Sequence, residues 1–513
     1  MSGLHVKALF VTFINLVGKS LGFIKTLVIA ATFGATGVLD AFWVAYSLPT
    51  VFPSIFTIVI STVFIPQFLK SDRASKGSWD GINTFITAVI FLNIILFFIL
   101  YLFSTEIVSA IAPGLSPEVS ANASNLFQYM AFATLIMGFS SLLVAIANAY
   151  EKFYLTAIES IVVNSLIIIV CFSVDDLKDI TVVVYAIIAG FAIQLLILLG
   201  SNKKIIMEYI RFRFNFFHPD FIKPLSSAVP LIVGYIGAVF IGIVDQWFAS
   251  FEDVGSISIL TYAVLLAFLP MEIFGNAIIQ TFYPRLSKYL STDQVSKGIK
   301  IYQQGLQLIV FILLPASLFL IFANLNLVQI IFQRGAFDYN DSLLTSSVIS
   351  ALAIGLLMQG ITYYNYRVLH AAQKSWYAIY IGLIGVLFNA LFNYLLAPVY
   401  GITGIAYATA ISLFLQCLLS TIILYKIYKI NFLSEYILKP IKLFTISAAS
   451  IFLYVYTVEL IQTSYCDASG CGLIPRLIPF IPLLLGFIVM AFVVRLEPLM
   501  SFIPEKYSKK IFR

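Results

Sequence analysis

Two lysines lie inside the first apolar run of the chain. The run extends from Ala8 to Gly34 and contains GKSLGFIKT at residues 18–26. An ammonium group in the hydrocarbon core costs about 2.5 to 3.5 kcal/mol even on lenient insertion scales. On a helix, Lys19 and Lys25 would stand about 9 Å apart along the axis and about 120° apart around it, so both can face one broad cavity. Two cations at this depth indicate a functional site. The alternative is a structural role, in which they pair with acids or extend toward the membrane surface.

Four polar residues in later apolar segments could bind a small cation. Asp245 lies in GIVDQWF, Asn389 and Asn393 are one helical turn apart, and Thr409 lies in the next apolar segment. A carboxylate, two amide oxygens and a hydroxyl are the hard oxygen ligands that such ions prefer. Polar residues also join membrane helices by hydrogen bonds, which is the alternative interpretation. Proton coupling through Asp245 alone is a further one.

These residues must be positioned by membrane helices. The 513 residues are 61% hydrophobic and 11% charged, whereas soluble chains carry about 25% charged residues. The sequence therefore predicts an all-α polytopic membrane protein with fourteen spans of about 20 residues each. We expect the spans near 8–34, 40–66, 81–103, 126–149, 155–174, 180–200, 225–250, 256–284, 304–326, 343–370, 377–397, 403–427, 438–461 and 473–496.

Lysine and arginine are concentrated in alternate loops. They cluster at 70–76, 203–223, 285–300 and 426–442 and in the C-terminal EKYSKKIFR, whereas the intervening loops contain only Lys178, Arg334 and Arg476. By the positive-inside rule both termini are cytoplasmic. Cys466 and Cys471 then fall in the outer loop between the last two spans, where they could form a disulfide or remain free thiols.

Spans 2 and 8 resemble each other, and both begin on the outer side. Each has a Leu-Pro pair early, at Pro49 and Pro270, and a proline followed by a lysine at its cytoplasmic end. Such parallel repeats are common in secondary transporters, where proline can bend a cavity-lining helix. Chance recurrence and ordinary membrane-helix proline are the alternatives. The repeat predicts a lobe at 1–200, a linker at 201–224, a second lobe at 225–430, and two extra helices with a basic tail at 431–513.

No pattern of an enzyme is present in the sequence. The three histidines are scattered, and no glycine-rich phosphate loop follows a strand. We therefore expect a protein that is not an enzyme, that has no organic cofactor and does not hydrolyse ATP, and that is driven by an ion gradient or the membrane potential. The basic residues belong to membrane loops, so nucleic acid is not an expected partner.

Three segments resemble the MurJ/MviN family of the multidrug/oligosaccharidyl-lipid/polysaccharide exporter superfamily. They are residues 18–49, residues 331–356 with the pattern FQRGAF, and residues 386–412. The resemblance implies two six-helix bundles around a central cavity, two additional C-terminal helices, and a location in the bacterial inner membrane. It also implies that the protein flips undecaprenyl-diphosphate-linked glycans such as lipid II, in contact with membrane lipids and with cell-envelope synthesis proteins.

The resemblance suggests roles for individual residues. Lys19 and Lys25 stand where relatives usually carry arginine and would bind the diphosphate, while Asp40 would pair with a group of span 1 or span 8 at the outer gate or cap a helix. Glu272 follows the Leu-Pro of span 8 and would belong to the bending segment. The cation set of Asp245, Asn389, Asn393 and Thr409 would accept Na⁺, or Asp245 would accept a proton, as the coupling ion.

Span 8 departs from the family pattern. Relatives carry an arginine and a glutamate where this chain has Val264, Leu265 and Phe268, and Pro53 and Ser54 replace charged residues of span 2. The predicted function is a flippase for lipid II or a related precursor working by alternating access. The alternatives are a flippase for an O-antigen or exopolysaccharide unit, a cation-coupled drug antiporter of the same superfamily, and a membrane scaffold that transports nothing.

Overall fold

The chain is helical throughout its long segments, as expected. The computed structural model describes residues 2–60, 80–173, 179–215, 232, 235, 237, 239–292, 294–429, 452–454, 456–458, 478 and 481. Within this part, eleven helices are long and apolar enough to cross a membrane. They correspond to predicted spans 1 to 6 and 8 to 12. Of the span at 225–250, the described part includes the short helix Val239–Ala249, whereas the spans at 438–461 and 473–496 lie largely outside the described residues, as do Cys466 and Cys471. The prediction of an all-α polytopic membrane fold is confirmed.

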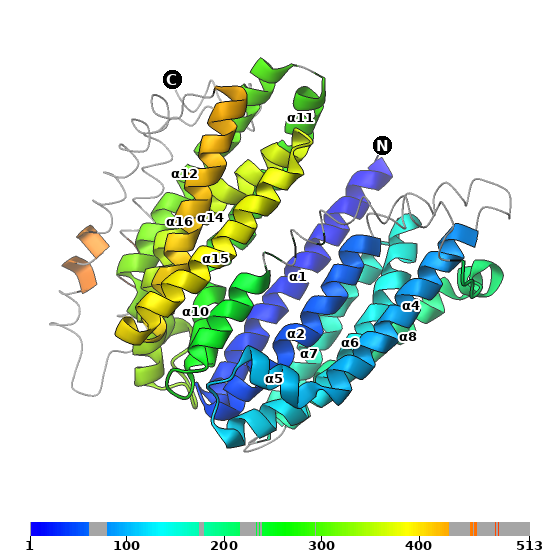
Figure 1. Ribbon diagram of the computed structural model, residues 1–513, viewed down its shortest axis with the longest axis horizontal. Coiled ribbons are helices and arrows are strands. Elements are labelled where there is room, and N and C mark those ends of the chain that lie inside the picture. Colours follow the sequence, from blue (N-terminus) through cyan, green and yellow to red (C-terminus); the bar gives the residue numbers. More distant parts are fainter. Residues whose placement is uncertain are drawn as a thin grey trace. The chain divides into compact units, whose positions relative to one another are not determined.

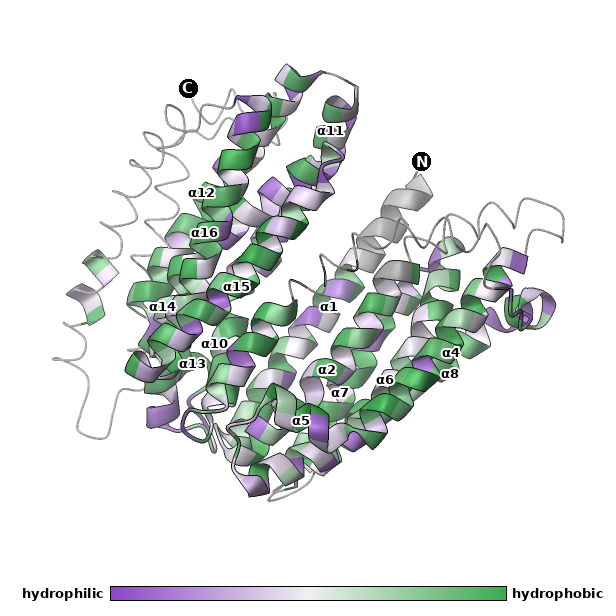
Figure 2. Ribbon diagram, viewed as in Figure 1, coloured by the Kyte–Doolittle hydropathy of each residue, from purple (hydrophilic) through white to green (hydrophobic). Residues whose placement is uncertain are grey.

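The chain forms two compact units. The first comprises Met1–Ser258 and Arg334–Asp338, and the second comprises Ile259–Gln333 and Tyr339–Arg513. The helices of the first unit are α1 (Ser2–Phe33), α2 (Gly37–Val59), α4 (Asp80–Leu102), α5 (Ser104–Ile111), α6 (Pro117–Ala149), α7 (Tyr154–Ser173), α8 (Thr181–Tyr209) and a short helix at Val239–Ala249. The long helices are predominantly hydrophobic along their lengths (Figure 2).

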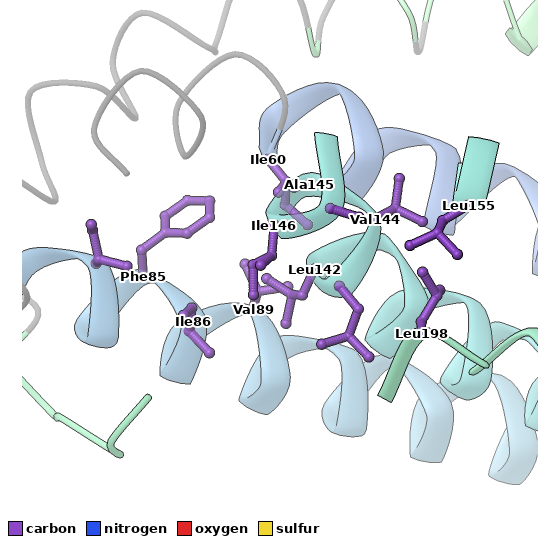
Figure 3. Packing of buried hydrophobic residues seen from close by; sticks show 13 residues of the cluster. Ile60, Phe85, Ile86, Val89, Leu142, Val144, Ala145, Ile146, Leu155 and Leu198 are labelled. Atoms are coloured by element: carbon purple, nitrogen blue, oxygen red, sulfur yellow. The ribbon is translucent and has the colours of Figure 1, made fainter. Parts of the chain in front are cut away.

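Helix α6 organises the first unit. It packs against α2, α4 and α8, while α7 packs against α1 and α8 (Figure 1). Its start is fixed locally, because Pro117 occupies the first turn, where no backbone donor is needed, and the Ser116 hydroxyl accepts a hydrogen bond from the Val119 amide at 3.4 Å. Its C-terminal half contributes Leu142, Val144 and Ile146 to a buried apolar cluster with residues of α4, α7 and α8 (Figure 3).

The second unit repeats this helix series. Its elements are α10 (Ser256–Pro270, of which the first turn belongs to the first unit), the π-helical turn Met271–Gly275, α11 (Asn276–Ser291), α12 (Val295–Phe322), α13 (Asn324–Ile331), α14 (Tyr339–Ala371), α15 (Ser375–Tyr400) and α16 (Ile402–Tyr428). Helices α5 and α13 are both 8 residues long, and α6 and α14 that follow them are both 33 residues long. Helix α14 packs against α12 and α16, as α6 packs against α4 and α8. This correspondence agrees with the parallel repeat expected from spans 2 and 8.

Two boundaries differ from the sequence expectation. Helix α8 continues to Tyr209, so the first part of the expected linker at 201–224 is helical. The units divide after Ser258 rather than within that linker. The reason is that the segment before α10 bonds to the first unit: the Gly114 amide donates to the Ser250 hydroxyl at 3.0 Å, and the Asp40 carboxylate accepts from Gly255 and Ser258. Apolar periodicity carries no information about such contacts.

Candidate functional site

Lys25 rests against aromatic rings rather than a carboxylate. Its side chain is half-buried on α1, and its Nζ lies 5.7 Å from the ring centroid of Tyr46 on α2. Tyr46 in turn packs edge-on against Trp43, with ring centroids 5.9 Å apart. Among the described residues, Lys25 forms no ion pair with an acid. A cation over an aromatic face gains about 0.5 to 2 kcal/mol and keeps its charge available for an anion.

Lys19 lies on the same helix and has an exposed side chain. Helix α1 is unbroken from Ser2 to Phe33, so the two lysines have the helical separation expected from the sequence. The helix ends at Gly34, whose φ of +64° is the left-handed conformation that favours glycine at a helix C-terminus. The substrate-binding role of both lysines stays a prediction.

Asp40 links the start of α2 to the start of α10. The side chain is only 3% exposed. Its Oδ2 accepts a hydrogen bond from the Gly255 amide at 2.6 Å, and its Oδ1 accepts from the Ser258 amide at 2.8 Å and the Ser258 hydroxyl at 2.6 Å. Ser258 lies in span 8, one of the two spans considered for an Asp40 partner. Asp40 does not cap its own helix, because the N-cap residue of α2 is Thr36 and Asp40 lies within the first helical turn.

The two Leu-Pro sites have different local structures. Pro49 is buried within α2, which continues past it, and the Thr134 hydroxyl donates to the Pro49 carbonyl at 2.8 Å. Pro270 ends α10, and the chain continues as the π-helical turn that contains Glu272. Glu272 is exposed and accepts a hydrogen bond from Asn276 at 3.1 Å. π-helical turns inside α-helices occur frequently at functional sites. The gating roles of these residues stay predictions.

Three of the four expected cation ligands lie together in the second unit. Asn389 and Thr409 bridge α15 and α16, with the Asn389 Nδ2 donating to the Thr409 Oγ1 at 3.1 Å. Asn393 donates to the Asn389 Oδ1 at 3.3 Å, and all three side chains are buried. These bonds are of the interhelical type considered as the alternative. Asp245 is buried, at 6% exposure, and belongs to the first unit. The four-residue cation site stays a prediction.

The FQRGAF segment packs onto the end of α1. The Ala336 amide donates to the Ala31 carbonyl at 2.7 Å, and Gly335 has a φ of +59°. A Cβ at Gly335 would overlap the Ala31 carbonyl oxygen, so this turn requires glycine. The sequence singled out the motif but not its contact with a helix some 300 residues away. Tyr46 and Ser258 were also missed, because a tyrosine or a serine in an apolar span gives no signal of its own.

Comparisons with known proteins identify a family over most of the chain. The family model "Lipid II flippase MurJ" matches residues 29–469. A Buchnera aphidicola protein named "Probable lipid II flippase MurJ" is 28% identical over 395 residues, which are 76% of each chain. A Rickettsia prowazekii protein of the same name is 26% identical over 415 residues, 79% of this chain and 80% of that one.

Solved structures agree on the fold. The structure titled "Lipid II flippase MurJ, inward closed conformation" superposes with a TM-score of 0.78 at 21% identity, covering 95% of this chain and 99% of that one. An inward-facing multidrug resistance MATE family transporter of the MOP superfamily superposes with a TM-score of 0.64 at 11% identity, covering 81% and 98%. The resemblance inferred from residues 18–49, 331–356 and 386–412 is therefore confirmed, and this polytopic membrane protein belongs to the MurJ lipid II flippase family.

Proposed function

We propose that this protein moves lipid II, or a closely related polyprenyl-diphosphate-linked precursor, from the inner to the outer leaflet of the bacterial inner membrane by alternating access. The observation that carries this proposal is the family match over residues 29–469, which includes nearly every described span. Two relatives matched over about three quarters of this chain are named "Probable lipid II flippase MurJ". The proposal makes the protein a transporter rather than an enzyme.

The lysines of α1 would bind the diphosphate. A diphosphate cannot pass apolar walls without compensating charge, because burying an isolated anion is very costly. Lys25 supports this role, since no acid among the described residues pairs with it and its aliphatic stem is half-buried. Lysine binds phosphate as a point charge without the two-pronged geometry of arginine. We therefore expect looser headgroup selection than an arginine pair would give.

A different polyprenyl-linked glycan is the second candidate substrate. It is favoured by the apolar residues Val264, Leu265 and Phe268 of α10, where relatives carry charges. Both candidates share the diphosphate, so the lysines would serve either one. We further propose that both termini are cytoplasmic, because lysine and arginine are concentrated in alternate loops. Coupling to Na⁺ or H⁺ is proposed from the polar residues Asp245, Asn389, Asn393 and Thr409.

A complementation experiment tests the proposal. The full chain is expressed in a bacterial host depleted of its own lipid II flippase, and lipid II exposed on the outer leaflet is quantified. The variants are Lys19→Ala/Lys25→Ala and the charge-matched control Lys203→Ala/Lys204→Ala, whose lysines are exposed at the end of α8. We expect the parent and the control to restore exposure, and the α1 double variant to lose at least about 90% of it, equivalent to about 1.4 kcal/mol or more.

The results of this experiment test the role of the lysines and the identity of the substrate separately. Full exposure with the α1 double variant would refute the diphosphate-binding role of the lysines. Absence of exposure with a parent protein that is folded in the membrane would refute lipid II as substrate. In that case, vesicles containing the purified protein and an undecaprenyl-diphosphate-linked repeat unit of different sugar composition test the second candidate.

A further inference from the structure

A polar cavity of about 350 Å³ lies within the first unit. It is bounded by α2, α6 and α7 and by Tyr235, and neither Lys19 nor Lys25 lines it. Its polar lining consists of Ser54, Thr57, Ser140, Ser141, Thr156 and Glu159. Val144 also lines it and belongs to the apolar cluster of Figure 3, so the cavity lies directly beside a packed hydrophobic core.

Glu159 is the charged group of this cavity. Its side chain is half-buried, and its Oε2 accepts a hydrogen bond from the Gln194 Nε2 at 2.9 Å. Gln194 is itself 1% exposed and holds the carboxylate in one orientation. Among the described residues, no lysine, arginine or histidine pairs with Glu159. A carboxylate partly removed from water without a cationic partner is destabilised, so a bound cation would stabilise it.

The hydroxyls around Glu159 present oxygen acceptors to the cavity. A hydroxyl has one hydrogen to donate, and four of the five serine and threonine hydroxyls have already donated it elsewhere. Ser54 donates to the Thr50 carbonyl at 3.1 Å, Thr57 to the Pro53 carbonyl at 3.0 Å, Ser141 to the Gly138 carbonyl at 2.7 Å, and Thr156 to the Asn148 side chain at 3.0 Å. The remaining lone pairs of Ser54, Ser141 and Thr156 suit a cation and repel an anion.

The fifth of these hydroxyls, that of Ser140, is a second and independent indication of a ligand. The Ser140 Oγ is buried, with the residue at 3% exposure, and has no hydrogen-bond partner among the described residues. A buried hydroxyl without a partner costs about 1 to 3 kcal/mol unless something fills the position. Because Ser140 lines the same cavity as Glu159, one occupant can satisfy both groups.

We propose that this cavity binds a monovalent cation, with Glu159 supplying the compensating charge and Ser140, Ser141, Thr156, Ser54 and Thr57 supplying neutral oxygen ligands. A single carboxylate balances a single positive charge, and the described residues contain no cluster of three or more metal-binding acids, histidines or cysteines that a divalent ion would favour. At about 30 Å³ per water molecule, the cavity also has room for an ion that keeps part of its hydration shell. The site does not depend on the lipid substrate proposed above.

Binding of ²²Na⁺ to the purified full chain tests this site without any lipid substrate. All proteins carry Asp245→Asn, which removes the carboxylate of the other expected cation set. Glu159→Gln is compared with Glu106→Gln, because Glu106 is exposed on α5 of the same unit. Ser140→Ala is a second test, since it removes no hydrogen bond present among the described residues. Folding of each variant is checked by size-exclusion chromatography.

We expect saturable binding of one Na⁺ by the parent and by Glu106→Gln. Glu159→Gln should bind at least about tenfold more weakly, and Ser140→Ala about two- to fivefold more weakly, as expected for loss of a charge and of one hydroxyl ligand. The proposal is overturned by a parent that binds no ²²Na⁺, or by a folded Glu159→Gln that binds as the parent does. Should Glu159→Gln fail to fold, unchanged binding by Ser140→Ala overturns it. The proposed flipping of lipid II is neither supported nor refuted by these cation-binding results.

Discussion

Replacing Asp40 with asparagine should destabilise the first unit by a calculable amount. The carboxylate accepts three hydrogen bonds of 2.6 to 2.8 Å from Gly255 and Ser258. The asparagine oxygen can keep the two bonds to Ser258, but its NH₂ group then faces the Gly255 amide, donor against donor. One charge-assisted bond of about 1.5 to 3 kcal/mol is lost, and a buried amide is left unsatisfied at about 1 to 3 kcal/mol.

A lower desolvation penalty for the asparagine side chain offsets part of this loss of stability. Burying a neutral amide avoids the desolvation penalty of a carboxylate, which is several kcal/mol per ion. We therefore expect a net loss of about 1 to 3 kcal/mol for Asp40→Asn. Asp40→Ala leaves all three donors without an acceptor, so its expected loss is larger, about 3 to 5 kcal/mol. The graded order of the two variants follows from the geometry alone.

Thermal unfolding of the purified protein in detergent measures the effect. Scans are compared at one rate, because large proteins often unfold irreversibly. The control is Asp80→Asn, which removes an exposed ion pair with Arg213 at 3.3 Å, with the two side chains 55% and 59% exposed. Surface pairs of this kind are worth about 0 to 1 kcal/mol. A Tm of Asp40→Asn that is the same as that of Asp80→Asn would show that the hydrogen bonds at Asp40 do not hold α2 to the start of α10.

Three further predictions use the same measurement. Gly335→Ala should lower the Tm, because φ of +59° costs an alanine about 1 to 2 kcal/mol and its Cβ overlaps the Ala31 carbonyl, whereas Gly382→Ala, in open space on α15, should not. Asn365→Ala should cost about 1 to 3 kcal/mol, because the fully buried amide accepts from the Tyr302 hydroxyl at 2.7 Å and donates to two hydroxyls of α16; an unchanged Tm would contradict this. Partial burial, and then the neighbouring Asp253 charge, raise the pKa of Glu252 above its ordinary 4.5, so its protonated form favours the folded state. The stabilising contribution of Glu252 therefore falls as the pH rises from 4.5 through the raised pKa. Glu252→Gln should remove that fall in stability.

The membrane helices could be predicted because their signal is local. Length and hydrophobicity alone located the eleven described spans, since an apolar run of about 20 residues has few alternatives in a bilayer. The short helices α5 and α13 were missed because 8 residues give too little periodicity to separate them from a loop. The extension of α8 to Tyr209 was missed because polar residues at a membrane surface continue a helix without an apolar signal.

Candidate functional residues could be identified from the sequence, but the groups that surround them in the fold could not. Asp40 was expected to meet a group of span 1 or span 8, yet two of its three donors are backbone amides, those of Gly255 and Ser258. The Gly255 amide is positioned by a φ of +95°. Glu159 has no feature in the sequence around it that indicates its surroundings. The structure instead surrounds it with residues of α2, α6 and α8, and burial by distant helices leaves no trace in the local sequence.

The repeated helix series explains why polar groups gather where they do. In the first unit a polar pair joins α7 to α8 through Glu159 and Gln194, and in the second unit a polar pair joins the corresponding helices α15 and α16 through Asn389 and Thr409. The fold therefore brings the same two helix faces together twice. What each pair can do is decided by the side chains, because the Glu159 carboxylate carries a charge that can attract a cation, whereas the Asn389 amide and the Thr409 hydroxyl are neutral. One architecture can thus hold two sites of different chemistry.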